Sequence, residues 1–354
     1  MSDTIRKLAS IRKIDNISPI SGADAIEVAA IDGWEVVVKK GGFKPGEHVI
    51  YIEIDSWVPT SVAPFLTKPG KIPRLYNDVA GERLKTMRFR GQLSQGLILN
   101  YWDYPEVVTA FHKTRLVNHL ENNDFDVTDI LGIQKWEQEV SASLRGVARG
   151  NFPSCIPKTD AERVQNMGRT FSHMIDGNFT WSVTEKLDGT SFTAYLNNGI
   201  FGVCSRNLDL IMDDSNVYWK IAIEYRIEEF LRRMGGNFAI QGEIIGEGIQ
   251  GNPYKLKDMH LYIFDVYDID GHRYLNDNER LEFIYSAEFK LNHVPFIDYN
   301  TTIDYDRHTL LETAEIKSKI NNSVDAEGVV YKCIENPNIT FKCISNSWLL
   351  KTGK

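Results

Sequence analysis

The stretch TEKLDGTS, residues 184–191, decides how the rest of the chain is interpreted. An alternating apolar run, residues 179–183, leads into it and predicts a strand that ends at Glu185. Lys186 then stands at the exit of that strand, where its amine can act as a covalent nucleophile. The amine of an unperturbed lysine has a pKa of about 10.4, so it attacks only where neighbouring cations or a bound metal lower that pKa. Asp188, two residues further on, is a candidate ligand for such a metal.

The same stretch has a simpler interpretation, because Asp188-Gly189 is a common turn pair and Lys186 can be a surface lysine beside that turn. From residue frequencies alone, the pattern Lys-x-Asp-Gly is expected in roughly one of ten chains of this length. The motif therefore indicates a nucleophile only if the rest of the chain supplies the groups that such a lysine needs.

The bulk composition is that of an ordinary globular protein long enough for two domains. The chain has 354 residues, of which 42% are hydrophobic and 25% charged. It contains no apolar run long enough to span a bilayer and no signal-peptide core near Met1. The net charge of -8 neither predicts nor excludes nucleic-acid binding, which depends on local patches. The cysteines show no paired metal-ligand spacing; they are Cys155, Cys204, Cys333 and Cys343. Four cysteines in a chain of this size favour a reduced intracellular compartment, such as the cytoplasm, over secretion.

Residues up to about 135 predict an all-β domain of short strands separated by turn signals, a spacing typical of a small barrel. The Pro-, Gly- and Lys-rich segment 59–83 predicts a long loop within it. Beyond that loop Lys85, Arg88 and Arg90 interleave with Phe89, a pattern that suits a nucleic-acid backbone and base. A solvated edge strand protected by its cations explains the pattern equally well. The predicted strands are residues 25–31, 34–40, 48–54 and 95–99.

Residues 105–150 predict a helical connection, and the second domain begins near Asn151. Thr159 and Glu162 match a capping box, which predicts the start of a helix. A longer helix is predicted over residues 216–234, where apolar residues recur at helical spacing before two glycines end it. The apolar positions of this helix are Ile223, Ile227, Phe230, Leu231 and Met234.

Three predicted strands of the second domain carry charged residues among apolar ones. They are residues 238–245 with Glu243, residues 326–332 with Glu327, and residues 339–344 with Lys342. Charges inside apolar strands are costly unless they are paired or bind a ligand. Together with Lys186, Asp188 and Arg206, they can converge on a phosphate, which needs cations, and on a divalent metal, which needs carboxylates. Each also has a local explanation: Glu327 as a turn residue, Lys342 on an exposed edge, Arg206 paired with Asp209.

Ordered as they are, these motifs resemble those of the covalent nucleotidyltransferase superfamily of ligases and capping enzymes. The nucleophile motif is matched by EKLDG at 185–189, and the later motifs follow in order. They are SRN at 205–207, GE at 242–243, IFD at 263–265, EGVVYK at 327–332 and FK at 341–342. The resemblance covers nearly the whole second domain.

The chain resembles most closely the ATP-dependent RNA ligases that have an N-terminal OB domain, often counted as the fifth RNA-ligase family. The matching stretches are RKLASI at 6–11, DGW at 32–34, GEHVIY at 46–51, PKTD at 157–160 and GEGIQG at 246–251. Twelve residues follow Lys342, whereas DNA ligases and capping enzymes carry a C-terminal OB domain there. The resemblance implies an α+β fold: an OB-type β-barrel over residues 1–135 with a helical connection to about 150, then a nucleotidyltransferase domain over 151–354, built of antiparallel sheets flanked by helices.

The resemblance also implies an ATP-dependent RNA ligase that joins 3′-OH and 5′-phosphate ends, at nicks in duplex RNA or RNA–DNA hybrid. It works through a lysyl-AMP intermediate, then an RNA-adenylate, with Mn²⁺ or Mg²⁺, and we expect a monomer that is not bound to membranes. The catalytic residues implied are Lys186, Lys342, Arg206, Glu243 and Glu327. ATP or AMP would be contacted by Glu185, Lys186, Arg206, Glu243, Phe264, Lys332 and Lys342. The metal would be positioned by Asp188 and Glu327, and RNA bound by Lys85, Arg88, Arg90 and Lys351.

Two other functions remain open at this stage. A GTP-dependent capping guanylyltransferase shares the motifs, although the short C-terminal segment argues against it. A non-catalytic nucleic-acid-binding protein could keep the fold without the chemistry, although every motif residue is present. Labelling with GTP but not ATP distinguishes the first, and RNA binding without nucleotide transfer distinguishes the second.

Overall fold

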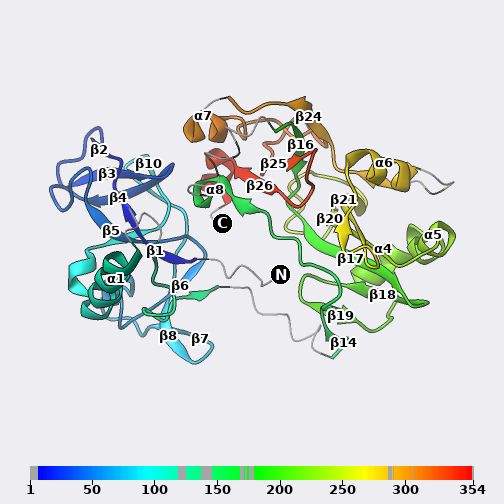
Figure 1. Ribbon diagram of the computed structural model, residues 1–354, viewed down its shortest axis with the longest axis horizontal. Coiled ribbons are helices and arrows are strands. Elements are labelled where there is room, and N and C mark those ends of the chain that lie inside the picture. The colour runs from blue at the N-terminus through cyan, green and yellow to red at the C-terminus, as the bar shows by residue number, and fades with distance from the viewer. Residues whose placement is uncertain are drawn as a thin grey trace. The chain divides into compact units, whose positions relative to one another are not determined.

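The computed structural model describes residues 7–118, 125–136, 146–167, 179–285, 291–304 and 306–352, together with Phe171, Met174 and Phe289; the side chains of residues 115–118 are not described. The chain forms two compact units, which divide between residues 139 and 140, with the chain end from Leu349 grouped with the first. Each unit is described by itself below (Figure 1). Among the residues that the structure describes, no helix is both long and apolar enough to cross a membrane.

The described residues of the first unit up to Trp136 form mostly short strands, together with the α-helix α1. Two four-stranded sheets have the orders β11-β5-β1-β12 and β13-β6-β8-β7, and a three-stranded meander β2-β3-β4 and the hairpin β9-β10 complete it. The helix α1 spans Pro105–Asn118 and buries Val107 and Phe111. The strands are β1 Ala9–Lys13, β2 Asn16–Pro19, β3 Ile26–Ile31, β4 Trp34–Lys39, β5 His48–Ile52, β6 Ser56–Pro59, β7 Arg74–Tyr76, β8 Val79–Arg83, β9 Met87–Phe89, β10 Gln92–Ser94, β11 Leu97–Leu99, β12 Phe125–Asp126 and β13 Gln134–Lys135.

The predicted strands of this unit are confirmed, and the predicted long loop over residues 59–83 is confirmed only up to residue 73. Its second half is the hairpin of β7 and β8, joined by Asn77 and Asp78, whose φ values are 46° and 62°. Two consecutive left-handed residues are what a tight hairpin turn requires, and Asn and Asp tolerate that conformation. The turn signal was obscured by the Pro and Gly residues that precede it.

The second unit contains two large sheets. An eight-stranded sheet has the order β14-β19-β18-β17-β20-β21-β22, with β23 also paired to β21, and a five-stranded sheet has the order β15-β26-β25-β16-β24. Nearly all pairs are antiparallel, as period-two alternation predicts. The elements are β14 Ala148–Asn151, β15 Glu162–Arg163, β16 Trp181–Lys186, β17 Thr190–Asn197, β18 Ile200–Cys204, β19 Leu208–Leu210, α4 Val217–Glu224, α5 Ile227–Met234, β20 Phe238–Ile245, β21 His260–Asp268, β22 Arg273–Tyr274, α6 Asp277–Tyr285, β23 Asn292–His293, β24 Phe296–Thr301, α7 Arg307–Glu312, β25 Gly328–Cys333, β26 Thr340–Ile344 and α8 Asn346–Thr352.

Helices α4, α5 and α6 share a hydrophobic core with the eight-stranded sheet. The predicted single helix over residues 216–234 is wrong, because α4 ends and α5 begins around Arg226, which has a left-handed φ of 53°. The Arg226 side chain bonds Glu229 and lies over the Phe289 ring, which fixes the break. As a result Ile223 is 47% exposed instead of buried, while Phe230 is fully buried.

The predicted helix start at Thr159 is also wrong. Glu162 and Arg163 form β15, parallel to β26, and a 3-10 helix over Val164–Asn166 follows. The Glu162 carboxylate accepts hydrogen bonds from the Arg163 backbone and the Asn166 side chain. Pairing with a distant strand therefore overrides the local capping signal, and it brings the preceding residues to the edge of the five-stranded sheet.

Candidate active site

Lys186 is the last residue of β16, in the five-stranded sheet, where it pairs with Gly328 of β25. Its Nζ donates a hydrogen bond to Glu327 Oε2 at 2.8 Å, and its side chain keeps 26% of its surface exposed. Burial lowers the pKa of the Lys186 amine, but the charges of Glu327, Glu243 and Asp188 outweigh burial and leave the pKa above its ordinary value. In this state the amine is therefore a protonated ammonium.

Two glycines let the strands approach closely around this lysine. A Cβ on Gly189 would lie 2.2 Å from the Ile244 carbonyl oxygen of β20, and one on Gly328 would lie 2.1 Å from the Cys343 carbonyl oxygen. Neither distance is compatible with a side chain, so the glycine of the Lys-x-Asp-Gly motif is required by the crossing of β20 and not only by a turn. Just after the end of β16, the Asp188 backbone N–H donates a hydrogen bond to the Tyr254 hydroxyl at 2.6 Å, which fixes the backbone beside Lys186.

Glu243 faces this lysine from the eight-stranded sheet, on β20 opposite Ser191. Burial raises the pKa of its carboxyl to about 8, and the charges of Glu327 and Asp188 add to burial while Lys186 and Arg206 oppose it. A carboxyl with that pKa is protonated at neutral pH and can donate a hydrogen bond as well as accept one.

The carboxylates around Lys186 outnumber its positive charge. Even with Glu243 protonated, the carboxylates of Asp188 and Glu327 both act on the one ammonium, and their oxygens are hard donors that suit Mg²⁺ or Mn²⁺. The described residues contain no group of three or more His, Cys, Asp or Glu side chains arranged to hold a metal ion by themselves. A divalent metal here would therefore take most of its ligands from phosphate oxygens and water, as Mg²⁺ commonly does.

Phe264 lies on β21 next to a β-bulge, where the register with β20 shifts between Gln241 and Gly242. It is partly buried and packs in one cluster with Leu187, so an apolar ring stands close to the lysine motif. Behind it, Lys332 of β25 forms an ion pair with Asp265 and donates to the Phe264 carbonyl oxygen at 3.4 Å. Burial lowers the pKa of Lys332, against the effect of Asp265. Bulges of this kind re-aim side chains beside active sites.

Arg206 and Lys342 come from different sheets and share one carboxylate. Asp160 lies 3.4 Å from the Arg206 guanidinium and 3.3 Å from Lys342 Nζ, through its two oxygens. The alternative that Arg206 pairs with Asp209 is wrong, since Asp209 pairs with Arg149 at 2.7 Å. Asp160 was missed as a site residue because its stretch was interpreted as a helix start; its membership of the PKTD match was the only signal.

The remaining predicted residues lie in other surroundings. The Glu185 carboxylate accepts the Lys319 backbone N–H at 2.8 Å and is buried, with a pKa raised by that burial. Successive strand residues point to opposite faces, so Glu185 and Lys186 face different ways, and its contact with ATP stays a prediction. In the first unit, Lys85, Arg88 and Arg90 are exposed on and beside β9, with Phe89 40% exposed among them. Lys351 is exposed near the end of α8.

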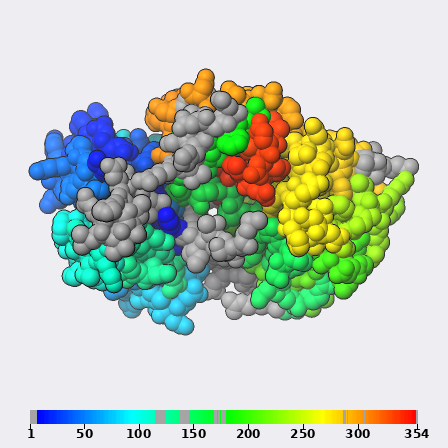
Figure 2. Space-filling view, viewed as in Figure 1, coloured from blue at the N-terminus to red at the C-terminus, as the bar shows by residue number. Residues whose placement is uncertain are grey.

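Figure 2 shows the outer surface of this arrangement: the segment near residue 340 meets the segment near residue 260 on one face of the second unit. The Lys332–Asp265 ion pair joins the same two sheets from within. The site is therefore a junction of two sheets, with Lys186, Lys342 and Glu327 on the five-stranded side and Arg206, Glu243 and Phe264 on the eight-stranded side.

Comparison with known proteins identifies relatives over almost the entire chain. An OB-fold domain model matches residues 8–101, and an RNA ligase model matches residues 179–345. A structure described as a Naegleria gruberi RNA ligase mutant with AMP and Mn is 40% identical, with a TM-score of 0.85, and the match covers 97% of this chain and 98% of that one. Naegleria gruberi RNA ligase with PPi matches at 40% identity and a TM-score of 0.84, covering 98% of both chains.

A further mutant of the same Naegleria gruberi protein, with ATP and Mn, matches at 40% identity with a TM-score of 0.84, over 97% of this chain and 98% of that one. A comparison with curated protein sequences found no match. The predicted α+β fold, with an OB barrel followed by a sheet-rich domain with helices, is confirmed.

Proposed function

The chain belongs to the RNA ligase family, as its motifs predicted, and we propose that it seals 3′-OH to 5′-phosphate ends at nicks in duplex RNA or RNA–DNA hybrid, with Lys186 as the carrier of AMP. The observation that carries the proposal is the contact of Lys186 with Glu327, with the charge of Asp188 also acting on the lysine. Two further cations, Arg206 and Lys342, both pair with Asp160. A nucleophilic lysine, carboxylates for a metal and cations for phosphate are the groups that lysine adenylylation requires.

In the first step the Lys186 amine attacks the α-phosphorus of ATP; a P–N bond forms and the P–O bond to pyrophosphate breaks. The ammonium loses a proton before attack, and Glu327 Oε2, 2.8 Å away, is the nearest acceptor. Arg206 and Lys342 exchange Asp160 for phosphate oxygens and stabilise the charge that develops on them. Asp188 and Glu327 would help to hold a divalent metal, Mn²⁺ or Mg²⁺, whose positive charge would offset the carboxylates and so lower the pKa of the lysine.

In the second step an oxygen of the RNA 5′-phosphate attacks the lysine-bound phosphorus. The P–N bond breaks, Lys186 regains a proton, and a pyrophosphate linkage joins AMP to the RNA end. In the third step the 3′-OH attacks the RNA phosphorus, its proton is lost to a base or to water, and AMP leaves. Through all three steps we assign adenine stacking to Phe264 and ribose binding to the protonated carboxyl of Glu243, whose pKa of about 8 allows it to donate.

We also propose where the RNA backbone binds and in which kind of compartment the protein works. The exposed hairpin with Lys85, Arg88 and Arg90 would hold the RNA backbone, with Phe89 available for stacking. All four cysteines are free thiols, which suits a reduced intracellular compartment.

The test is incubation of the purified protein with α-labelled ATP and Mn²⁺ or Mg²⁺, followed by denaturing electrophoresis. The proposal predicts protein-bound AMP that Lys186→Ala abolishes, and sealing of a nicked RNA duplex by the wild type. Retention of label in Lys186→Ala, or labelling by GTP and not ATP, would contradict it.

A further inference from the structure

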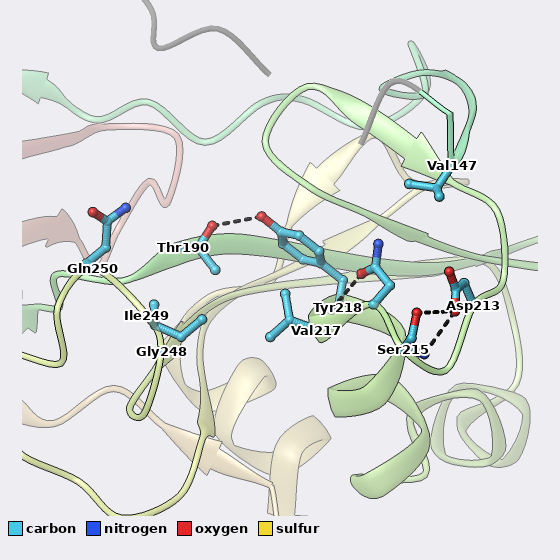
Figure 3. Close-up of a pocket in the computed structure, with 10 residues that line it drawn as sticks. Val147, Thr190, Asp213, Ser215, Val217, Tyr218, Gly248, Ile249 and Gln250 are labelled. Atoms are coloured by element: carbon cyan, nitrogen blue, oxygen red, sulfur yellow. Dashed lines mark hydrogen bonds between the residues drawn. The ribbon is translucent and has the colours of Figure 1, made fainter. Parts of the chain in front are cut away.

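A cavity of about 450 Å³ lies within the second unit, beside the lysine motif (Figure 3). Three segments that are far apart in the sequence line it: Thr190 at the start of β17, residues 213–218 before and within α4, and residues 248–250 after β20, together with Val147. The volume exceeds that of one nucleoside and falls in the range of ordinary small-molecule pockets.

The described residues that line this cavity combine apolar and polar side chains, and none of these described residues is a cation. Thr190 Oγ1 and the Tyr218 hydroxyl lie 2.8 Å apart in a hydrogen bond, and the side-chain amides of Asn216 and Gln250 also reach the cavity wall. The carboxylate of Asp213 adds a negative charge, and it accepts two hydrogen bonds from Ser215. Such a wall repels a phosphate and suits hydroxyl groups and an uncharged base.

The cavity is adjacent to the proposed site of nucleotide transfer. Thr190 follows Asp188-Gly189 directly, and its neighbour Ser191 pairs with Glu243 across β17 and β20. Burial raises the pKa of the Tyr218 hydroxyl and the charge of Glu243 raises it further, so Tyr218 also lies within electrostatic reach of that carboxyl. A group held in the cavity is therefore next to the ribose-binding side of the nucleotide site.

The loop at 246–251 matched the RNA ligases in sequence, yet none of the three chemical steps uses it. It is a fixed loop: Ile249 is buried, and its backbone forms hydrogen bonds with Gly246 at 3.1 Å and with Asn252 at 2.7 Å. Gln250 is held in a left-handed conformation with φ of 48°, which is uncommon for a residue other than glycine. Figure 3 shows Gln250 and Asp213 at opposite ends of the cavity, with Tyr218 between them. Unusual backbone conformations of this kind gather at ligand sites.

We propose that this cavity binds the terminal nucleoside of the RNA strand that carries the 3′-OH, with the Thr190–Tyr218 pair and Gln250 contacting its ribose hydroxyls. The inference rests on the proposed function. The 5′ end brings a phosphate, which the anionic and neutral wall disfavours, and the triphosphate of ATP has Arg206 and Lys342 elsewhere in the site. The 3′ end brings two vicinal hydroxyls, which are donors and acceptors that match the side chains present.

The test measures sealing of a nicked RNA duplex whose 5′ end is already adenylated, so that only the last chemical step is followed. Tyr218→Phe, Thr190→Val and Gln250→Ala are compared with the matched control Tyr225→Phe, which removes a hydroxyl from the end of α4 that does not line the cavity. Each variant acts on two substrates, one with a 3′-terminal ribonucleotide and one with a 2′-deoxynucleotide. Formation of lysyl-AMP from ATP is measured in parallel.

We expect Tyr218→Phe to slow sealing of the ribonucleotide end about five- to tenfold, the effect of losing one hydrogen bond. On the 2′-deoxy end the penalty of the variant should be smaller, because that substrate already lacks one of the two ribose hydroxyls that the Thr190–Tyr218 pair contacts. Lysyl-AMP formation should be unchanged, as should every activity of Tyr225→Phe. Gln250 is exposed, so Gln250→Ala repeats the test without risk to folding.

An equal penalty on both ends, or a loss of lysyl-AMP that matches the loss of sealing, would overturn the inference. So would unchanged sealing by all three cavity variants. The proposed function fails separately, if the wild type itself forms no lysyl-AMP.

Discussion

Two lysine–carboxylate pairs in the second unit use the same chemical groups and have opposite electrostatics. In the first pair, with Glu327, the Lys186 side chain is 26% exposed, and nearby acidic side chains raise the pKa of its amine. In the second pair, with Asp265, the Lys332 side chain is 10% exposed, and burial lowers the pKa of its amine. The second pair is closed and joins two sheets, whereas the first has surplus negative charge that an incoming cation can offset. The exposure and neighbouring charges of a lysine, more than its ion-pair partner, therefore distinguish a candidate nucleophile from a lysine that stabilises the contact between two sheets.

The strongest test of this difference is Glu327→Gln, which removes a charge and the nearest proton acceptor from Lys186. We expect lysyl-AMP formation to fall at least about a hundredfold, the usual effect of losing a positioned acid or base. Single-turnover labelling with ATP measures it. The free energy of unfolding should change little, since the glutamine keeps the shape of the side chain, and a rate within twofold of wild type would mean that Glu327 plays no such part.

Lys332→Met breaks the other pair and should act on stability. It leaves Asp265 buried without a partner, which costs on the order of 3 kcal/mol in the free energy of unfolding. Urea denaturation followed by fluorescence measures the change. The double variant Lys332→Met/Asp265→Leu should recover most of the loss, and an unaltered denaturation midpoint in the single variant would contradict a stabilising role for Lys332.

Asp160→Asn tests whether Arg206 and Lys342 are available to bind phosphate. Asp160 occupies Arg206 and Lys342 before phosphates arrive, so its neutralisation should tighten the binding of pyrophosphate about two- to fivefold, the size expected for one partly exposed ion-pair partner. Isothermal titration with pyrophosphate measures this. The control Glu279→Gln removes the carboxylate partner of Arg273 on the surface and should leave the affinity unchanged. Weaker binding by Asp160→Asn would show that Asp160 positions the two cations instead.

A further prediction concerns Glu243. Its pKa is about 8 in the folded protein, against about 4.3 for an unperturbed glutamate. Between these values the folded state holds a proton that the unfolded state has lost, so the free energy of unfolding falls as pH rises. Glu243→Gln removes this term, and the difference in denaturation midpoint between variant and wild type should grow from pH 5 to pH 8. A difference that is constant over this range would contradict a protonated Glu243.

The sequence predicted most of the described strands and the three acidic residues that act on Lys186, namely Asp188, Glu243 and Glu327, because each lies in a short motif that can be interpreted locally. It did not predict that Asp160 bridges Arg206 and Lys342, because that contact depends on β15 pairing with a strand about 180 residues later. The break at Arg226 was missed for a related reason: the apolar spacing continues through it, and a left-handed arginine is held by tertiary contacts. Local sequence patterns predicted which residues carry the chemical groups of the site. Long-range strand pairing determined which of them share a partner, as Arg206 and Lys342 share Asp160.

The central claim is that Lys186, and not Lys332 or another lysine, carries AMP. The direct measurement is peptide mapping by mass spectrometry of the wild-type protein after reaction with ATP and Mn²⁺. The account predicts one adenylylated peptide, the one that contains residues 184–191, and none in Lys186→Arg, which keeps the positive charge but not the amine. AMP on a peptide that contains Lys332, or on any peptide of Lys186→Arg, would contradict the account.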